Sequence, residues 1–240
     1  MEPNLSKKRK LELSSDSNIC SNIELSKKPE TNLSGKKDKN QSAGNDDTIN
    51  IETYRNHIYF YCSVSKKTCL KLNLELKRVA QGIIDNGSNL LKKDKFIYLH
   101  INSFGGSVFS SFSTIDTIIN LPVPVVSIIE GAAASAATLI SVMCSYRVIY
   151  PNSYMLIHQL SSSAWGKMDE IEDEIINLKE LMKRIKSIYK RKTDINKNAL
   201  DDILKHDLWW NSKKCLEVGL VDKIMESKPV YEFDESNLEL

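Results

Sequence analysis

A serine, a histidine and an aspartate follow one another along this chain in surroundings that suit nucleophilic acyl transfer. Ser135 lies in the segment GAAASAA (131–137), which joins an apolar run to a small-residue helix. Small neighbours leave a serine hydroxyl unobstructed, and a helix N-terminus presents unpaired N–H groups beside it. The alternative is a serine packed inside a small-residue helix. The segment by itself favours that alternative, because it is not a complete G-x-S-x-G motif.

The candidate base and its orienting acid lie further along the chain. His158 follows the apolar run 155–157, and a histidine at the edge of a strand suits a general base near neutral pH. A structural, hydrogen-bonded histidine is the alternative. Asp207 precedes two tryptophans, and partial desolvation by them would suit a histidine-orienting role; a solvated or helix-capping aspartate is its alternative. The neighbouring acids Asp201, Asp202 and Asp222 are the other candidates for this role. His206 is adjacent to Asp207, so a different pairing stays open at this point.

Two adjacent glycines supply a candidate anion-binding loop. Gly105 and Gly106 lie between a predicted strand and a predicted helix, where backbone N–H groups can face an anionic centre. Such a loop would hold either the oxyanion of a tetrahedral intermediate or a phosphate group. Neither G-x-G-x-x-G nor the Walker pattern is present, so the glycines alone do not decide between these ligands.

The elements that must position these residues alternate between strands and helices. Apolar runs predict strands at 57–62, 96–101, 123–129, 146–150 and 155–157. Apolar spacing and end signals predict helices at 70–84, 107–120, 132–143, 168–192 and 198–204. This alternation predicts an α/β domain with a mainly parallel sheet.

The helix predicted at 168–192 carries a narrow apolar seam. Its apolar residues recur in alternating steps of four and three: Ile171, Ile175, Leu178, Met182, Ile185 and Tyr189. That spacing is typical of a seam between packed helices, whereas a helix that only covers its own core usually has a broader stripe. Acidic residues near its start and basic residues at its end complement the helix dipole. We therefore expect this helix to make contacts between subunits.

Composition narrows the class of protein. The chain has 240 residues, a formal net charge of +2 and five cysteines without a C-x-x-C pair. The cysteine pattern argues against a disulfide framework or a metal site and favours a reducing, cytoplasmic setting, and the small net charge gives no support for a nucleic-acid partner. No apolar run is long enough to cross a bilayer, so no membrane span is expected. Residues 1–53 predict a disordered Lys/Ser/Asn-rich tail, whose KKRK run (7–10) is interpreted as a solvated charge cluster in preference to a nucleic-acid patch. Residues 229–240 are expected to form a loose end.

Four segments taken together resemble the Clp protease proteolytic subunit, family S14 of the serine peptidases. They are INSFGGSV (101–108), GAAASAA (131–137), PNSYMLIHQ (151–159) and CLEVGLVD (215–222), and they occur in the family's order. The resemblance covers about residues 56–225.

Three residues and one segment depart from the family's pattern. Phe104 and Leu160 stand where prolines are usual, and Glu130 stands where an apolar residue is usual. The family's N-terminal hairpin, which contacts an ATPase, has no counterpart before Tyr54. These departures affect loop shape and partner binding, and they remove no catalytic group.

The resemblance implies a fold and an assembly. The fold would be crotonase/Clp-protease-like, a repeated β-β-α superhelix with a catalytic domain at 54–228 and a protruding handle helix at 168–192. The implied assembly is a homo-oligomer of two stacked heptameric rings that encloses a chamber for unfolded polypeptide substrate. An AAA+ unfoldase partner would use the ATP. Substrate would lie as an added strand near residues 163–167.

The same resemblance assigns roles to five residues. It implies a Ser135–His158–Asp207 triad, with the backbone N–H groups of Gly106 and Ala136 binding the oxyanion; no cofactor or metal is implied. Two alternatives stay open. One is a crotonase-like acyl-CoA enzyme, which also uses two backbone N–H groups on an acyl oxygen. The other is a catalytically silent ring subunit that regulates an active partner. A complete triad weighs against both.

Overall fold

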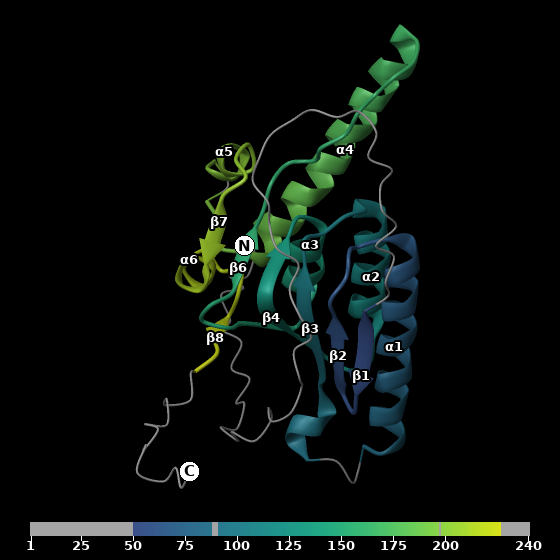
Figure 1. Ribbon diagram of the computed structural model, residues 1–240, viewed down its shortest axis with the longest axis vertical. Coiled ribbons are helices and arrows are strands. Elements are labelled where there is room, and N and C mark those ends of the chain that lie inside the picture. Colours follow the sequence, from purple (N-terminus) through teal and green to yellow (C-terminus); the bar gives the residue numbers. More distant parts are fainter. Residues whose placement is uncertain (1–49, 88–90, 197, 227–240) are drawn as a thin grey trace, which may run out of the picture. The chain divides into compact units, whose positions relative to one another are not determined.

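The computed structural model describes residues 50–87, 91–196 and 198–226 (Figure 1). Its elements are β1 (Ile51–Tyr54), β2 (His57–Phe60), α1 (Lys66–Asp85), η1 (Lys92–Lys95), β3 (Ile97–Ser103), α2 (Val108–Asn120), β4 (Val125–Ala134), α3 (Ala136–Met143), β5 (Tyr146–Ile149), β6 (Tyr154–Leu156), α4 (Met168–Lys192), α5 (Leu200–Ile203), β7 (Trp209–Asn211), α6 (Ser212–Glu217) and β8 (Lys223–Ile224). The loose end expected at 229–240 and residues 1–49 of the expected tail lie outside the described residues.

Strand β1 is not among the predicted strands, and it moves the start of the folded domain. Residues 51–53 were expected to belong to the tail, but Ile51 is buried and lies opposite Phe60 in an antiparallel pairing of β1 with β2. The ammonium group of Lys71 in α1 also donates to the carbonyl oxygen of Ile51, at 2.8 Å. A four-residue strand directly after a polar segment has too few apolar residues to give a clear pattern.

The described strands form one mainly parallel sheet in the order β1-β2-β3-β4-β5-β8. Parallel ladders join β2 to β3, β3 to β4, β4 to β5 and β5 to β8. Strand β6 runs parallel to the second half of β4, and β7 pairs antiparallel with β6. The predicted α/β class with a mainly parallel sheet is confirmed.

Strand β4 changes its partner halfway along its length. Residues 126–129 pair with β5, and residues 132–134 pair with β6. Gly131 lies at the change with a φ of +80°, which a glycine adopts without strain. The predicted helix at 132–143 is therefore wrong in its first turn. Residues 132–134 continue the strand because β6 satisfies their backbone groups, and α3 begins at Ala136.

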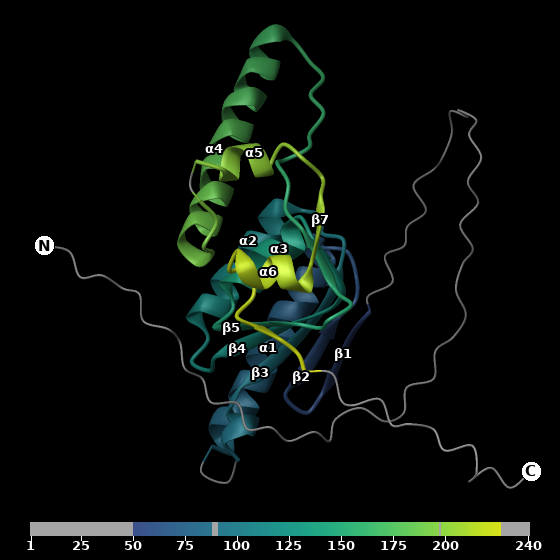
Figure 2. The ribbon, with the colours of Figure 1, turned by 90° about the vertical axis from the view of Figure 1, so that its left-hand side faces the viewer.

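Helices α1, α2 and α3 form a layer on one face of the sheet (Figures 1 and 2). Alternate strand residues that point into this layer, such as Ile58, Leu99 and Ile129, are buried with apolar residues of the three helices in the main core. The opposite face carries a smaller apolar cluster around Val126, Ile128 and Val148. The period of two along β3 and β4 thus separates two different surfaces.

Helix α4 has the bounds that the sequence predicts, and only its C-terminal part is packed. Ile185, Ile188 and Tyr189 are buried, and α4 contacts α3. The N-terminal part extends beyond the sheet (Figures 1 and 2), and there Ile175 and Ile176 are 44% and 63% exposed. Residues 163–167, expected near a substrate-pairing strand, are irregular and exposed, with no strand beside them among the described residues. No helix in these described ranges is long and apolar enough to cross a membrane.

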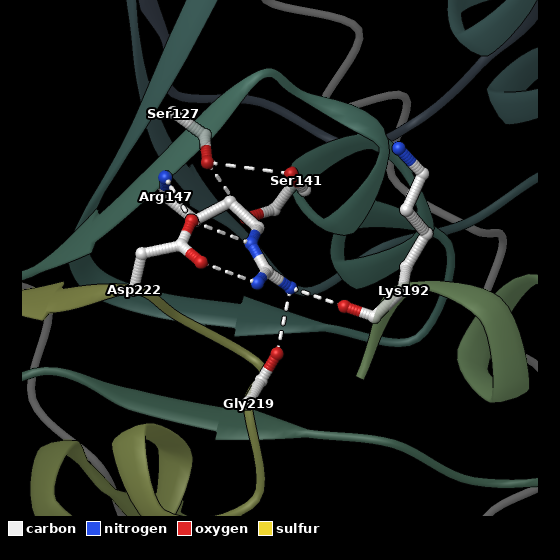
Figure 3. A network of polar contacts seen from close by, with 6 residues as sticks. All are labelled: Ser127, Ser141, Arg147, Lys192, Gly219 and Asp222. Atoms are coloured by element: carbon white, nitrogen blue, oxygen red, sulfur yellow. Dashed lines mark hydrogen bonds and ion pairs between the residues drawn. The ribbon is translucent and has the colours of Figure 1, made fainter. Parts of the chain in front are cut away.

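A buried arginine ties the C-terminal segments to the sheet (Figure 3). The guanidinium of Arg147 in β5 donates to both carboxylate oxygens of Asp222, at 2.9 and 2.7 Å. Its Nη1 also donates to the carbonyl oxygens of Lys192, at the end of α4, and of Gly219, at 2.8 and 2.7 Å. One side chain therefore joins β5, α4 and the segment before β8.

This network predicts that Arg147 has a large effect on stability. In Arg147→Met, the Asp222 carboxylate keeps the backbone N–H of residue 147 but loses both guanidinium donors, and the carbonyl oxygens of Lys192 and Gly219 lose theirs. Removal of one partner of a buried ion pair typically costs about 3–5 kcal/mol. We expect the free energy of unfolding, measured by urea denaturation, to fall by about 3 kcal/mol. Lys205→Met, which breaks an exposed ion pair with Asp202, should cost less than about 1 kcal/mol. Equal losses in the two variants would contradict the proposed importance of the network.

Candidate active site

Ser135 occupies a sharp turn between β4 and α3. Its φ of +53° and ψ of −123° are unusual for a residue with a side chain and typically cost about 1–3 kcal/mol. The Ser135 N–H donates to the carbonyl oxygen of Leu156 in β6, at 2.9 Å, and the Thr138 N–H donates to the carbonyl oxygen of Ser135, at 3.0 Å. The Ser135 hydroxyl does not cap the helix. The turn thus presents a hydroxyl that makes no capping bond at the N-terminus of α3.

The glycine pair lies against this serine turn. A Cβ atom on Gly105 would lie 2.8 Å from the Cβ of Ser135 and 2.6 Å from the carbonyl oxygen of Ala134, so only glycine fits. The Val64 N–H donates to the Gly105 carbonyl oxygen, at 2.8 Å, and fixes the loop on its other side. The N–H groups of Gly106 and Ala136 have no acceptor among the described residues. Both predicted oxyanion donors are therefore unpaired, on two segments that contact each other.

His158 lies two residues beyond β6, next to the end of β4. The register of the two strands places Leu156 opposite Ala134, so Ser135 and His158 follow neighbouring strand ends. Nδ1 of His158 is 3.4 Å from Oδ1 of Asp207, an ion-pair distance that is longer than a good hydrogen bond. Among the described contacts there is no hydrogen bond between the Ser135 hydroxyl and the His158 ring. The structure thus brings the histidine to the aspartate and leaves the serine–histidine contact open.

The neighbouring acids are paired elsewhere, and Asp207 lies against His158. Asp201 pairs with Lys186, at 2.7 Å, and Asp202 pairs with Lys205, at 3.3 Å. Asp222 belongs to the Arg147 network. The histidine in ion-pair contact with Asp207 is His158 and not the adjacent His206. Asp207 is 77% exposed, so the tryptophans do not desolvate it in this chain alone.

Phe104 connects the glycine loop to the segment that carries Asp207. Its ring packs edge-on against Trp209, with 6.0 Å between the ring centroids. Sequence reasoning identified Phe104 only as a departure from a family pattern and missed this contact. Phe104 is 74% exposed and Trp209 is 43% exposed. Phe104 directly precedes the glycine pair, and Trp209 follows Asp207 by two residues.

Other nucleophiles and metal ligands are less suitable. Burial raises the pKa of Cys62 to about 11 and those of Cys144 and Cys215 to about 12, so these thiols stay protonated at neutral pH. Within the part of the chain that the structure describes, no group of three or more acidic, histidine or cysteine side chains is arranged to hold a metal ion. Serine chemistry is the reaction that the described residues favour.

A second group of titratable residues lies on β2, β3 and β4, on the face opposite the helices. His57 Nδ1 is 2.8 Å from His100 Nε2, and Nδ1 of His100 lies 2.7 Å from Glu130. The hydroxyl of Tyr61 donates to the other carboxylate oxygen of Glu130. Burial raises the pKa of Glu130, but bonding to His100 and Tyr61 outweighs it and leaves the pKa below its usual value. Glu130, unusual in sequence, thus has specific partners.

Comparison with known proteins gives one consistent result. A family profile described as Clp protease matches residues 65–228. The ATP-dependent Clp protease proteolytic subunit 2 of Treponema denticola is 33% identical over 140 residues, which cover 58% of this chain and 70% of that protein. The ATP-dependent Clp protease proteolytic subunit of Lactococcus lactis subsp. cremoris is 35% identical over 138 residues, or 55% and 69% of the two chains.

The histidine pair on the sheet predicts a pH dependence of stability. Burial, together with the charge of His100, lowers the pKa of His57 from 6.5 to about 4. Between these values the unfolded chain binds a proton at His57 that the folded chain does not bind. The free energy of unfolding should therefore rise as the pH increases from about 4 to 6.5.

The test is urea denaturation at several pH values. In His57→Phe, which keeps a ring against Tyr98 but cannot titrate, the rise should be shallower by up to about one bound proton. His206→Gln, at an exposed histidine, is the matched control and should keep the wild-type slope. Identical slopes in wild type and His57→Phe would contradict the assignment.

Proposed function

Because this chain belongs to the Clp protease family, we propose that it is a proteolytic subunit of a Clp-type serine peptidase. The family match extends over the region that holds the serine turn, the glycine loop, His158 and Asp207. It also confirms the expected crotonase/Clp-protease-like fold class. We propose a catalytic domain that runs from residue 51 to 228, preceded by a separate N-terminal tail.

The proposed reaction begins at the turn between β4 and α3. Ser135 attacks the scissile carbonyl carbon, and His158 takes the hydroxyl proton and later gives it to the leaving amine. Asp207 orients the ring through Nδ1 and stabilises the imidazolium that forms. The N–H groups of Gly106 and Ala136 bind the developing oxyanion. Water then hydrolyses the acyl-enzyme by the same proton transfers, so the reaction requires no cofactor or metal.

The observation that carries this proposal is the pair of unpaired N–H groups beside a strained serine. Gly105 packs against Ser135, so the glycine loop and the start of α3 present Gly106 and Ala136 next to the nucleophile. A serine inside an ordinary helix would have neither the positive φ nor an adjacent glycine loop. The open serine–histidine contact has a simple physical account, because catalytic hydrogen bonds often tighten only when substrate binds.

The His158–Asp207 contact also distinguishes the proposal from an acyl-CoA enzyme of crotonase type. Two backbone N–H groups on an acyl oxygen are common to both reactions. An aspartate held 3.4 Å from Nδ1 of a histidine serves a base that must take and return a proton. The acyl-CoA alternative gives no role to this pair.

We further propose that the subunits stack as two heptameric rings around a chamber. Ile175, on the apolar seam of α4, is 44% exposed, and the part of the helix that carries it extends beyond the sheet. Burial of this seam against a second subunit would remove apolar surface from water. The enclosed chamber would admit unfolded polypeptide, delivered by an ATP-using unfoldase partner.

The nucleophile is tested with a fluorophosphonate probe and a fluorogenic peptide. The probe should label Ser135, as located by peptide mapping, and Ser135→Ala should lose labelling together with about a million-fold of peptidase activity. Asp207→Asn should cost roughly ten thousand-fold, because it favours the wrong imidazole tautomer. Asp202→Asn is the matched control on an exposed neighbour and should stay near wild type.

Two outcomes would oppose this assignment. Retained activity in Ser135→Ala would exclude Ser135 as the nucleophile. A wild-type chain that forms rings but neither reacts with the probe nor cleaves peptide would support the catalytically silent subunit instead.

Assembly is tested by introducing charge into the seam. Ile175→Glu combined with Met182→Lys leaves the net charge unchanged and should split double rings into smaller species with lower peptidase activity. Exchange of the exposed Glu180–Lys183 pair on the same helix is the charge-matched control and should leave the assembly intact. Sedimentation velocity measures both. A wild-type chain that sediments as an active monomer would rule out the ring proposal.

A further inference from the structure

A buried hydrogen-bonded chain leads from helix α4 to the serine turn. Tyr189, in the last turns of α4, is 2% exposed, and its hydroxyl lies 2.6 Å from Oγ1 of Thr138 in α3. The same Oγ1 lies 2.6 Å from the carbonyl oxygen of Ser135. Thr138 is itself fully buried. Three consecutive groups thus connect the packed end of α4 to the backbone of the proposed nucleophile.

The direction of both hydrogen bonds follows from the chemistry of the groups. A carbonyl oxygen only accepts, so the single proton of the Thr138 hydroxyl must point at Ser135. Thr138 then has only lone pairs for Tyr189, and the tyrosine hydroxyl must donate to it. Burial raises the pKa of Tyr189, which keeps this donor protonated. The bond from Tyr189 polarises Thr138 and strengthens its bond to the carbonyl oxygen.

That carbonyl belongs to the same peptide unit as the N–H of Ala136. A peptide unit is planar, so its carbonyl and its N–H point in fixed, opposite directions. Whatever holds the carbonyl oxygen of Ser135 therefore aims the N–H of Ala136. On this ground, which rests on the proposed function, we propose that Thr138 and Tyr189 are positioning residues that orient the Ala136 N–H toward the oxyanion.

The alternative is ordinary packing of a helical threonine. Threonine hydroxyls often bond to the carbonyl three or four residues earlier, and such a bond by itself implies no function. Here the accepting carbonyl belongs to a residue at φ +53°, a conformation that persists only when its surroundings hold it. The Thr138 N–H also donates to this oxygen, at 3.0 Å, so both donors of Thr138 hold one carbonyl, and Tyr189 holds the Thr138 hydroxyl.

The same hydrogen bonds link α4 to the serine turn. At its other end, the helix that carries Tyr189 exposes Ile175, one residue of the apolar seam. A shift of α4 along or about its axis would move the Tyr189 hydroxyl relative to Thr138.

The test separates positioning from stability by steady-state kinetics on assembled full-length protein with a fluorogenic peptide. Thr138→Val removes the hydroxyl at nearly constant volume, and kcat should fall roughly ten- to a hundredfold with KM little changed, less than the hundred- to thousandfold typical when a donor is deleted. Tyr189→Phe should lower kcat roughly three- to tenfold. Thr138→Ser, which retains the hydroxyl, should restore most of kcat.

A double-mutant cycle and a matched control complete the design. Because Tyr189 acts through Thr138, Tyr189→Phe should have no further effect on kcat in the Thr138→Val background. Ser141→Ala removes another buried hydroxyl of α3, one that is bonded to Ser127 and makes no contact with Ser135. It should lower stability while leaving kcat near wild type.

The possible outcomes separate a failure of the positioning role from a failure of the proposed peptidase function. An active wild type whose kcat is unchanged by Thr138→Val would overturn the inference and leave the proposed peptidase intact. Equal losses of kcat in Thr138→Val and Ser141→Ala, or additive losses in the double variant, would contradict the positioning role and show that Thr138 and Tyr189 act only through packing. A wild type without peptidase activity or probe labelling would overturn the proposed function, and the inference with it.

Discussion

The change of partner along β4 is the constraint on which the arrangement of the site depends. Residues 126–129 pair with β5 and residues 132–134 pair with β6, with Gly131 at a φ that permits the change. If β4 ended at Ile129, the serine would not reach the end of β6. Because β6 leads on to His158, the same ladder that extends β4 places the candidate base and Ser135 after neighbouring strand ends. Backbone hydrogen bonds thus determine the position of two candidate catalytic residues.

The small residues around Ser135 follow from the same constraint. The ladder to β6 and the bond from Ser135 N–H to Leu156 hold the turn in a conformation that the chain would otherwise avoid. Close approach of the glycine loop then leaves no space for a Cβ at Gly105. Strain at Ser135 is offset by hydrogen bonds on both sides of the turn, and the arrangement leaves the N–H groups of Gly106 and Ala136 free for a ligand.

The C-terminal third of the chain completes the site through tertiary contacts. Strand β7 pairs with β6 and places Asp207 near His158, although the two residues are far apart in sequence. The Arg147 network holds the end of α4 and the segment before β8 to β5.

The three residues that depart from the family pattern each have a partner in the folded structure. Phe104 packs on Trp209, Glu130 bonds to His100, and the Leu160 N–H lies 3.3 Å from the sulfur of Met182.

The sequence alone determined the features that depend on local pattern. The seam and charge distribution of α4 predicted its bounds, and the alternation of apolar runs predicted the α/β class, because period and capping are local properties. The four motifs identified the family and the five candidate residues without any knowledge of the distances between them.

Tertiary structure decided the rest. It extended β4 through three alanines whose helical propensity is high, because β6 satisfies their backbone. It also paired Asp207 with His158 in place of the adjacent His206, and it joined Tyr189 to Thr138 across two helices. Such contacts arise from packing between distant segments, which no short window of sequence contains.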